Sequence, residues 1–502
     1  MNELPRTKLR EIVSKRGKGV VREGRRVEGL LRDYCGEHRR EVSVLVAALE
    51  EHVPEDLLAA PASAPREALL ARLARRLCDN LALSEAAARW AVNSWALALG
   101  LVTEEELKAL ERSAPATEQR EPVAGGAGPA PAQTAPGKGG GKVVVSADGR
   151  GHYRSIGEAL QRAAPGTTIL VRPGVYEESV TLDRQVEIVG DGPRDQISVR
   201  AANASCISMR TDRARVAGLT LRGVSGGTPS FAVDVTTGSL LLEDCAVSSD
   251  TLSGVGVHGE RAAPVIRGCL IHDARDSGVY FFDGAKGEVE DCEVARSANV
   301  GVAVTGGASP AIRRTKIHGG ADAGLVVWGG GSAVVEACEI YDNRRAGLGV
   351  SEGGRARVRA CRIHGGDNSG VFVHDRGDAV LEDCDVHGHR EAEVAVDRRG
   401  QLMLLRCEIH DGLDSGVFVR GGGQTLIQEC TVMGNASAGV VVGENSIAEL
   451  LACRVVGNGG AGIKVAGGGS ARVSDSDLSG NAYGPWDADE GAYLEGGGNR
   501  EE

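Results

Sequence analysis

The second half of the chain repeats one arrangement of apolar and polar positions every 23 residues. Within each repeat, apolar and polar residues alternate over three short stretches, and none of these stretches has a helical period. Since alternation with a period of two is typical of strands, each repeat predicts three short β-strands. Two apolar columns carry the pattern most clearly: Ile266, Val289, Ile312, Val335, Val358, Leu381, Leu404, Ile427, Leu450, Val473, and Ile271, Val294, Ile317, Ile340, Ile363, Val386, Ile409, Val432, Val455, Leu478.

A column of cysteines lies between these two apolar columns: Cys269, Cys292, Cys338, Cys361, Cys384, Cys407, Cys430, Cys453. Thr315 and Ser476 occupy the same register. Disulfide bonds or metal ligation are the alternatives to a stacked core column. Rungs about 4.8 Å apart with parallel side chains miss disulfide geometry, and no Cys-x-x-Cys or Cys/His metal spacing occurs. We therefore expect free thiols that pack as small hydrophobes.

Three strands per 23 residues leave no antiparallel partner within a repeat, so each strand pairs with its equivalent in the next repeat. The sequence therefore predicts a mainly β fold, a right-handed parallel β-helix. About a dozen coils would form a rod on the order of 60 Å long. Glycine recurs nine residues after each cysteine rung, and only Glu393 and Pro485 interrupt that column. Tight coil corners are predicted at Asn343, Asn435, Asn458 and Asn481.

The pattern divides the chain into four segments. Residues 1–112 predict a small all-α, adaptor-like domain, with Leu69, Leu70, Leu73 and Leu77 on one helix face. Residues 113–141 are rich in Ala, Pro and Gly and predict a flexible linker. Residues 142–486 predict the β-helix, with Trp486 closing its last coil, and residues 487–502 an acidic tail that frays. A capping box at Ser155 predicts a short helix over 155–163 that covers the first coil.

Composition restricts the partners. The net charge of −12 argues against a nucleic-acid-binding protein, and no stretch of 18 apolar residues predicts a membrane span. The N-terminal residues lack the apolar segment of a signal peptide. Unpaired cysteines favour a reducing compartment, so we expect a cytoplasmic protein. No motif indicates a cofactor, a metal site or a catalytic residue.

The outward side of the glycine strand carries the residues that best suit a ligand site. Aromatic side chains make up only 3% of the chain, yet several fall on this one face, and exposed aromatic patches often mark a ligand or partner surface. Burial under a loop or under the helical domain is the alternative. The candidate ligand-binding residues are Tyr280, Phe282, Trp328, Phe372, His374, Asp397, Phe418 and Arg420.

Two further outward columns have a structural and a functional interpretation. His272, His318, His364, His387 and His410 could titrate near neutral pH or bind a metal, or simply form an exposed column without acidic partners held at fixed geometry. Asp276, Asn299, Asp322, Asn368, Glu391 and Asp414 could line an acidic groove, or accept backbone hydrogen bonds and shape the turns.

Two stretches resemble known families. The segments at 145–156 (VSADGRGHYRSI) and 169–178 (ILVRPGVYEE) resemble the opening of pectin methylesterases and other pectin-lyase-fold proteins, and units such as 338–350 (CEIYDNRRAGLGV) resemble the CASH repeats of NosD-like proteins. The resemblance covers about residues 143–486 and implies the fold. The Gln-Asp-Thr-Leu-Tyr, Asp-Phe-Ile-Phe-Gly and Gly-Arg-Pro-Trp motifs of pectin methylesterases are missing, as are the polygalacturonase signatures. The enzymatic chemistry therefore does not carry over with the fold.

Residues 5–102 resemble a small helical module of multidomain bacterial proteins, through 30–35 (LLRDYC), 39–42 (RREV) and 88–100 (ARWAVNSWALALG). Three functional hypotheses follow. The first is a non-catalytic binding or scaffold protein for a polysaccharide or a protein partner. The alternatives are a carbohydrate-active enzyme of the polysaccharide lyase, hydrolase or esterase class, and a signalling adaptor recruited through the helical domain.

Overall fold

The computed structural model describes residues 3–16, 38–50, 53–59, 85–102 and 141–502, together with residues 27, 31, 34, 35, 70, 73, 74 and 77. The chain forms two separate compact units, divided near residue 133. Among the described residues, no helix combines the length and apolar character needed to cross a membrane. The predicted linker at 113–141 lies almost entirely outside the described residues.

The N-terminal unit is helical, as predicted. Its bounded helices are α1 (Glu3–Arg16), α3 (Arg39–Glu50), α4 (Val53–Ala59) and α6 (Glu85–Ala98). Trp95 of α6 is fully buried, and its indole N–H donates to the carbonyl of Leu45 at 2.9 Å. The other three helices contact α6, which makes it the centre of this small core. Three residues of the predicted helical face, Leu70, Leu73 and Leu77, are helical and buried, and Leu69 lies outside the described residues.

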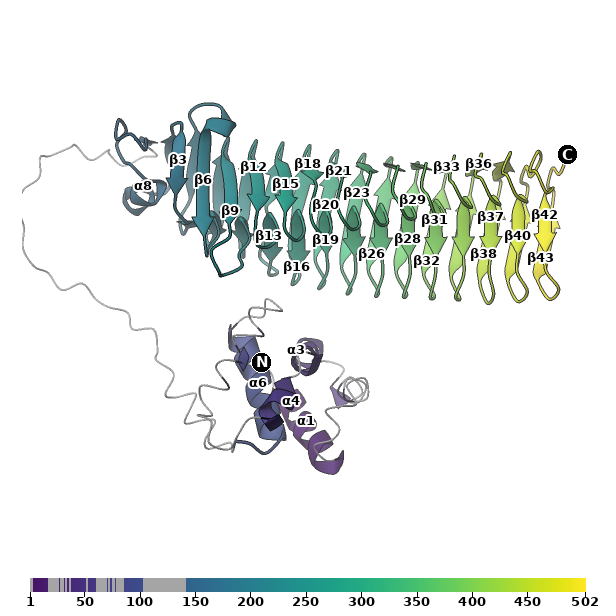
Figure 1. Ribbon diagram of the computed structural model, residues 1–502, viewed down its shortest axis with the longest axis horizontal. Coiled ribbons are helices and arrows are strands. Elements are labelled where there is room, and N and C mark those ends of the chain that lie inside the picture. Colours follow the sequence, from purple (N-terminus) through teal and green to yellow (C-terminus); the bar gives the residue numbers. More distant parts are fainter. Residues whose placement is uncertain are drawn as a thin grey trace, which may run out of the picture. The chain divides into compact units, whose positions relative to one another are not determined.

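The second unit is a parallel β-helix, in which each coil contributes one strand to each of three sheets (Figure 1). The first sheet has 16 strands: β1 (Lys142–Val145), β2 (Thr167–Val171), β5 (Val186–Gly190), β8 (Arg213–Ala217), β11 (Ser239–Glu243), β14 (Val265–Arg267), β17 (Lys286–Glu290), β20 (Ser309–Arg313), β23 (Ser332–Glu336), β26 (Arg355–Arg359), β29 (Asp378–Glu382), β32 (Gln401–Leu405), β35 (Gln424–Gln428), β38 (Ile447–Leu451), β41 (Ser470–Ser474) and β43 (Tyr493–Gly497).

The second sheet has 13 strands within residues 141–502: β3 (Gly174–Glu177), β6 (Ile197–Ala202), β9 (Thr220–Val224), β12 (Ala246–Ser249), β15 (Leu270–Ala274), β18 (Glu293–Ala295), β21 (Lys316–His318), β24 (Glu339–Tyr341), β27 (Arg362–His364), β30 (Asp385–His387), β33 (Glu408–His410), β36 (Thr431–Met433) and β39 (Arg454–Val456). A short 3-10 helix, η2 (Arg194–Gln196), precedes β6.

The third sheet has 14 strands in the same part of the chain: β4 (Val180–Leu182), β7 (Ile207–Met209), β10 (Val233–Val235), β13 (Val255–His258), β16 (Val279–Phe282), β19 (Val302–Val304), β22 (Leu325–Val327), β25 (Leu348–Val350), β28 (Val371–Val373), β31 (Val394–Val396), β34 (Val417–Val419), β37 (Val440–Val442), β40 (Ile463–Val465) and β42 (Trp486–Ala488). The predicted 23-residue register is confirmed, and Val371, for example, pairs with Val394. The prediction was about a dozen coils, and the longest sheet has 16 strands, so the rod is roughly 70 Å long at the usual strand spacing.

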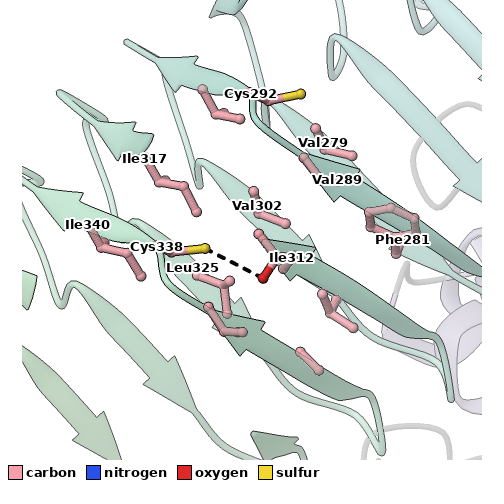
Figure 2. Packing of buried hydrophobic residues seen from close by; sticks show 14 of the residues in the cluster. Val279, Phe281, Val289, Cys292, Val302, Ile312, Ile317, Leu325, Cys338 and Ile340 are labelled. Carbon is pink, nitrogen blue, oxygen red and sulfur yellow. Dashed lines mark hydrogen bonds between the residues drawn. The ribbon is translucent and has the colours of Figure 1, made fainter. Parts of the chain in front are cut away.

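The cysteine column lies inside the coils, as predicted, and its thiols are free and buried. Figure 2 shows Cys338 among the stacked Val and Ile side chains, with its Sγ directed at the carbonyl of Ile312, 3.5 Å away. The residue before Cys338, Ala337, has a positive φ of 52°, which turns the chain at this corner. The backbone N–H of Cys338 then donates to Sγ of Cys361 at 3.3 Å. The column therefore satisfies corner amides as well as filling space.

The two residues that interrupt the cysteine column serve the same corner amides. The Oγ1 of Thr315 accepts from the N–H of Cys292 at 3.4 Å, and the Oγ of Ser476 accepts from the N–H of Cys453 at 3.0 Å. A small side chain with an acceptor atom at this position is therefore what the corner requires. Sulfur and hydroxyl oxygen both meet that requirement, which explains why Ser and Thr replace Cys here.

The two ends of the solenoid differ. At the first coil, α8 (Ile156–Arg162) begins at the predicted cap, where Ser155 accepts from the N–H of Glu158 at 3.1 Å. The apolar side of this helix joins the core, so it covers the end of the rod (Figure 1). At the other end, Trp486 pairs with Ile463 in an inward column, as predicted. Strand pairing continues past residue 486 through β43, so the segment predicted as a fraying tail extends the solenoid.

Candidate functional site

The eight candidate residues all lie on the outer face of the third sheet or directly after its strands. Tyr280, Phe372 and Phe418 occupy the central outward position of β16, β28 and β34, in one column along the rod. The other five form the neighbouring column two residues further along each coil: Phe282, Trp328, His374, Asp397 and Arg420. The two columns do not form one continuous surface, because small side chains such as Gly349 separate the aromatic residues into two clusters.

The first cluster consists of Tyr280, Phe282 and Trp328, and its rings pack on one another. The ring centroids of Tyr280 and Phe282 are 4.7 Å apart, and Trp328 stacks on Tyr280 at 6.2 Å. Phe282 also stacks on His258 at 4.7 Å and is only 9% exposed. Burial raises the pKa of Tyr280 to about 12. Because these rings cover each other, this cluster has little apolar surface left for a ligand.

Sequence reasoning missed two members of the first cluster. Phe231 lies 6.3 Å from both His258 and Phe282, measured between ring centroids. His258 in turn contacts the carboxylate of Asp234 at 2.9 Å. Both residues belong to early coils whose lengths depart from 23 residues. The 23-residue spacing therefore does not assign them to a column.

The second cluster surrounds a groove of about 560 Å³. Phe372 and Phe418 lie two coils apart in the same column, and Ala395 occupies the position between them. The small methyl group of Ala395 leaves the space that two larger neighbours enclose. The residues lining the groove are Asn368, Ser369, Phe372, Glu391, Ala392, Ala395, Val396, Asp414, Phe418 and Arg420.

Charged side chains fix one wall of this groove. The guanidinium of Arg420 pairs with Asp397 at 3.0 Å and lies 5.4 Å from the ring centroid of Phe418. On the coil of Phe372, the ring of His374 packs on that phenylalanine at 4.4 Å and bonds to Asp375 at 2.8 Å. The hydrogen bond to His374 holds the pKa of Asp375 below its usual value. Three of the eight predicted residues, Phe372, Phe418 and Arg420, therefore line this groove, and His374 and Asp397 contact them from outside its lining.

Carboxylates form the opposite wall. Glu391 and Asp414 are exposed, occupy equivalent positions on consecutive coils, and line the groove together with Asn368. This confirms the acidic-groove interpretation for part of that column. Another member accepts a backbone hydrogen bond: Asp322 accepts from the N–H of Ala323 at 2.8 Å, whereas Asp276 accepts from the side chains of Ser253 and Asn299. Both interpretations of the column therefore hold, on different coils.

A buried histidine–glutamate pair lies directly beneath the groove. His389 and Glu393 are 1% and 0% exposed, and Nδ1 of His389 bonds to a carboxylate oxygen of Glu393. The other carboxylate oxygen accepts from the backbone N–H of His389 at 2.8 Å. The pair flanks Glu391 and Ala392 in sequence, so it supports the backbone of the acidic wall. Glu393 was visible as a break in the glycine column, whereas His389 was missed.

The corner asparagines give the signal that would have identified His389. It occupies the register of Asn343 and Asn435, and its two neighbours in that column are glycines, Gly366 and Gly412. A Cβ atom on Gly366 would lie 3.2 Å from His389, and one on Gly412 would lie 2.7 Å from Glu393. Four positions in the sequence therefore reflect the pair: His389 and Glu393 themselves, and the two glycines that leave space for their side chains.

The family model described as "right handed beta helix region" matches residues 205–359, 253–401 and 346–499. Together these matches span residues 205–499, more than half of the 502 residues. The chain belongs to the right-handed β-helix family. The groove and the buried pair both lie within the matched span.

One curated relative and several solved structures are similar to this β-helix protein. A pectinesterase/pectinesterase inhibitor U1 of Solanum lycopersicum is 28% identical over 172 residues, which cover 30% of this chain. The match spans only 28% of that protein's length. The periplasmic alginate epimerase AlgG is 16% identical over 65% of this chain and 78% of that chain, with a TM-score of 0.43. A GH87 α-1,3-glucanase catalytic domain is 13% identical over 66% and 67% of the two chains, with a TM-score of 0.44.

The histidine column lies on the second sheet of the β-helix. His364, His387 and His410 stack with centroids 5.0 and 4.9 Å apart, and Tyr341 and His318 continue the stack. The prediction that this column lacks fixed acidic partners is wrong. Carboxylates one coil earlier contact the imidazoles: Glu293 with His318 at 3.2 Å, Glu339 with His364 at 3.4 Å, and Asp385 with His410 at 3.0 Å.

The pKa values of two of the stacked imidazoles shift in opposite directions. Burial lowers the pKa of His387. Burial also acts on His410, but its hydrogen bonds to Asp411 and Asp385 outweigh that effect and raise its pKa. Within the described part of the chain, no group of three or more His, Cys, Asp or Glu side chains has the arrangement of a metal site.

Proposed function

We propose that this protein is carbohydrate-active and that the groove between Phe372 and Phe418 binds a segment of a polysaccharide. The observation that carries the proposal is the combination of two aromatic side chains, one cation and two carboxylates around a single open groove. Sugar rings present C–H faces that pack on aromatic side chains, and hydroxyl groups that bond to carboxylates and amides. The pectinesterase relative supports the carbohydrate class.

A polymer suits the groove better than a free sugar. The lining residues come from three consecutive coils, so the groove extends about 10 Å along the rod at the usual strand spacing. The third sheet continues beyond both ends of the groove, and within residues 141–502 no strand crosses the groove. A chain of sugars can therefore lie along the sheet and place one part of its length between the two phenylalanines.

A catalytic role is the second candidate, and it rests on Glu391 and Asp414. Their equivalent positions on consecutive coils place their backbones about 4.8 Å apart. Side chains on adjacent coils can bring two carboxyl groups to the roughly 5–5.5 Å of retaining glycosidases, in which one acts as general acid and the other as nucleophile. The missing pectin methylesterase motifs exclude a direct transfer of that enzyme's chemistry. The scaffold and adaptor hypotheses from the sequence stay predictions.

Binding is tested with a glycan array, followed by calorimetry of the full chain with the polysaccharide that the array selects. We expect Phe372→Ala and Phe418→Ala each to weaken binding about tenfold, because each loses the burial of one aromatic ring. Val441→Ala is the matched control, since Val441 lies in the same column one coil beyond Phe418. Unchanged affinity in both phenylalanine variants would exclude this groove as the site.

Catalysis is tested separately on the selected polysaccharide. The full chain is incubated with it and the products are analysed by mass spectrometry, using Glu391→Gln and Asp414→Asn as variants. These variants keep the shape of each side chain and remove its charge. If the wild type releases shortened or modified chains and both variants release none, the carboxylates catalyse the reaction. If either variant releases the same product, the substituted residue is not catalytic.

A further inference from the structure

A second groove, of about 670 Å³, lies on the turns that lead from the third sheet to the first sheet of the next coil. We call it the turn groove. Its lining comes from five consecutive turns and the strands that follow them, which corresponds to about 20 Å along the rod. None of its lining residues belongs to the aromatic groove. The residues are Gly353, Arg355, Arg376, Asp378, Arg399, Gln401, Gly422, Gln424 and Asn445.

The turn groove is cationic in a chain whose net charge is −12. It contains three arginines and one carboxylate, Asp378. Other arginines on the same turns are neutralised: Arg398 pairs with Asp375 at 3.3 Å and Arg420 with Asp397 at 3.0 Å. Within the described residues, the guanidinium groups of the three groove arginines form no ion pair. Their charge is therefore available to an external anion.

The backbone shows that two of these arginines occupy unusual positions. Arg376 and Arg399 have φ values of 65° and 62°, in the left-handed region that side chains disfavour. The equivalent residue is glycine on other coils, including Gly330 and Gly422. Glycine adopts this conformation without strain, so packing alone gives no reason for an arginine here.

Uncharged donors complete the lining. Gln401 and Gln424 are paired residues on β32 and β35, in the same column as Arg355 and Asp378. Their amide groups, with that of Asn445, face the groove on the coils that follow the arginines. Guanidinium groups bind planar carboxylates and sulfates through paired hydrogen bonds, and amides bind hydroxyl groups. A ligand with both kinds of group along its length matches this sequence of donors.

We propose that the turn groove is a separate binding site for an acidic polysaccharide, one that bears carboxylate or sulfate groups at regular intervals. The choice of a polysaccharide rests on the proposed function, whereas the choice of an anion rests on the arginines. Donors that recur once per coil suit a repeating polymer. A nucleic acid is disfavoured because no aromatic side chain lines the turn groove to stack on a base.

The test uses calorimetry of the full chain with four probes: polygalacturonate, dextran sulfate, neutral dextran and polycytidylate. The first variant is R376G/R399G, which installs the glycine that other coils already carry at this turn position. The second is R355Q, with R357Q as its matched control. Arg357 is exposed on the same strand, β26, but does not line the groove. R355Q and R357Q each remove one positive charge, and only R355Q removes it from the turn groove.

We expect the wild type and R357Q to bind polygalacturonate or dextran sulfate equally well. R355Q and R376G/R399G should bind at least about tenfold more weakly, since each loses charge-assisted hydrogen bonds. Binding by the wild type should weaken as salt rises, and binding of neutral dextran should not depend on the arginines. Which of the two acidic probes binds more tightly identifies the anionic group.

Three results overturn the proposal: no binding of either acidic probe by the wild type, equal binding by R376G/R399G, or tighter binding of polycytidylate at the same salt concentration. The double variant F372A/F418A separates this inference from the proposed function. If it leaves all carbohydrate binding unchanged while the arginine variants weaken it, the aromatic groove fails and the turn groove stands. The converse result rejects the turn groove and keeps the aromatic groove.

Discussion

Two versions of the same interior corner occur in this β-helix. In the later coils, Asn435, Asn458 and Asn481 form a ladder in which each side-chain amide donates to the next, at 3.0 and 2.9 Å. The same oxygens accept backbone N–H groups one coil away, at 3.2 and 3.0 Å. In the coil of Cys384, His389 and Glu393 replace this arrangement. Both versions satisfy a buried amide, but with different side chains.

The difference shows that a bulkier buried pair enters the repeat together with smaller neighbours. The asparagine corner is self-consistent from coil to coil, because each residue serves the next. The histidine–glutamate corner needs space, and Gly366 and Gly412 supply it on either side. This interruption lies under the aromatic groove, where the outer surface also departs from uniform small residues. A broken interior column therefore marks a place where the surface above it is specialised.

The largest effect should come from breaking the irregular corner. Glu393→Ala leaves His389 buried without its partner and opens a cavity, so we expect a loss of about 3 kcal/mol in the free energy of unfolding. The measurement is chemical denaturation followed by circular dichroism. A loss below about 1 kcal/mol would mean that the pair is not a structural unit. Glu391→Ala, on the exposed wall two residues earlier, is the control and should change stability little.

The regular corner should be somewhat less sensitive. Asn458→Ala removes an acceptor for the N–H of Asn435 and a donor to the carbonyl of Val432, 3.2 Å away. We expect a loss of about 2 kcal/mol in the free energy of unfolding, since buried polar groups on two coils lose a partner. Asn499, which follows Ser476 in the cysteine column and whose amide is only partly buried, provides a comparison at an end of the solenoid. An equal loss for Asn499→Ala would show that burial does not determine the cost.

Replacing the cysteine should cost the same free energy of unfolding in the irregular coil of Cys384 and in the regular coil of Cys430. Cys384→Ser and Cys430→Ser each keep a small acceptor at the corner, as Thr315 and Ser476 do naturally. We expect both variants to lose about 1 kcal/mol and to agree within about 0.5 kcal/mol. A much larger loss for Cys384→Ser would mean that the irregularity extends beyond the corner to the rung of the same coil.

The smallest effect is expected from converting the irregular corner into the regular one. The double variant H389N/E393G installs the side chains that the same two columns carry two coils further along, at Asn435 and Gly439. Because the buried pair is removed as a whole, we expect a change within about 1 kcal/mol, far from the sum of the two single variants. A cycle of the wild type, both single variants and the double variant measures this coupling. Additive losses would contradict it.

The inward columns made the fold predictable. In-register stacking requires similar side chains on successive coils, so the positions of Val371 or Ile363 could be read directly from the spacing. The corner role of the cysteines could not, because the positive φ at residues such as Ala337 leaves no signature when the residue is not glycine. The same limitation hid the turn groove, whose arginines resemble ordinary polar turn residues in sequence.

The outer face was predictable only as a set of columns. Spacing placed Phe372 and Phe418 on one face, but the groove depends on Ala395, a small residue that carries no signal by itself. Spacing also grouped Trp328 with them, although its ring packs on Tyr280 in a different cluster. Outward positions have no neighbour requirement comparable to that of the core, so their contacts depend on side-chain conformation and size rather than on period.

The confirmed 23-residue register fixes the distance between surface sites on different coils as a whole number of strand spacings. Removing one complete coil would bring the Trp328 cluster and the Phe372 groove closer by a single strand spacing, about 4.8 Å, and leave every column in phase. Removing one residue from within a strand would instead turn the inward positions that follow it in that strand outward. Duplication or loss of coils can therefore change the distance between two surface sites only in whole steps, while the chemistry of each site stays intact.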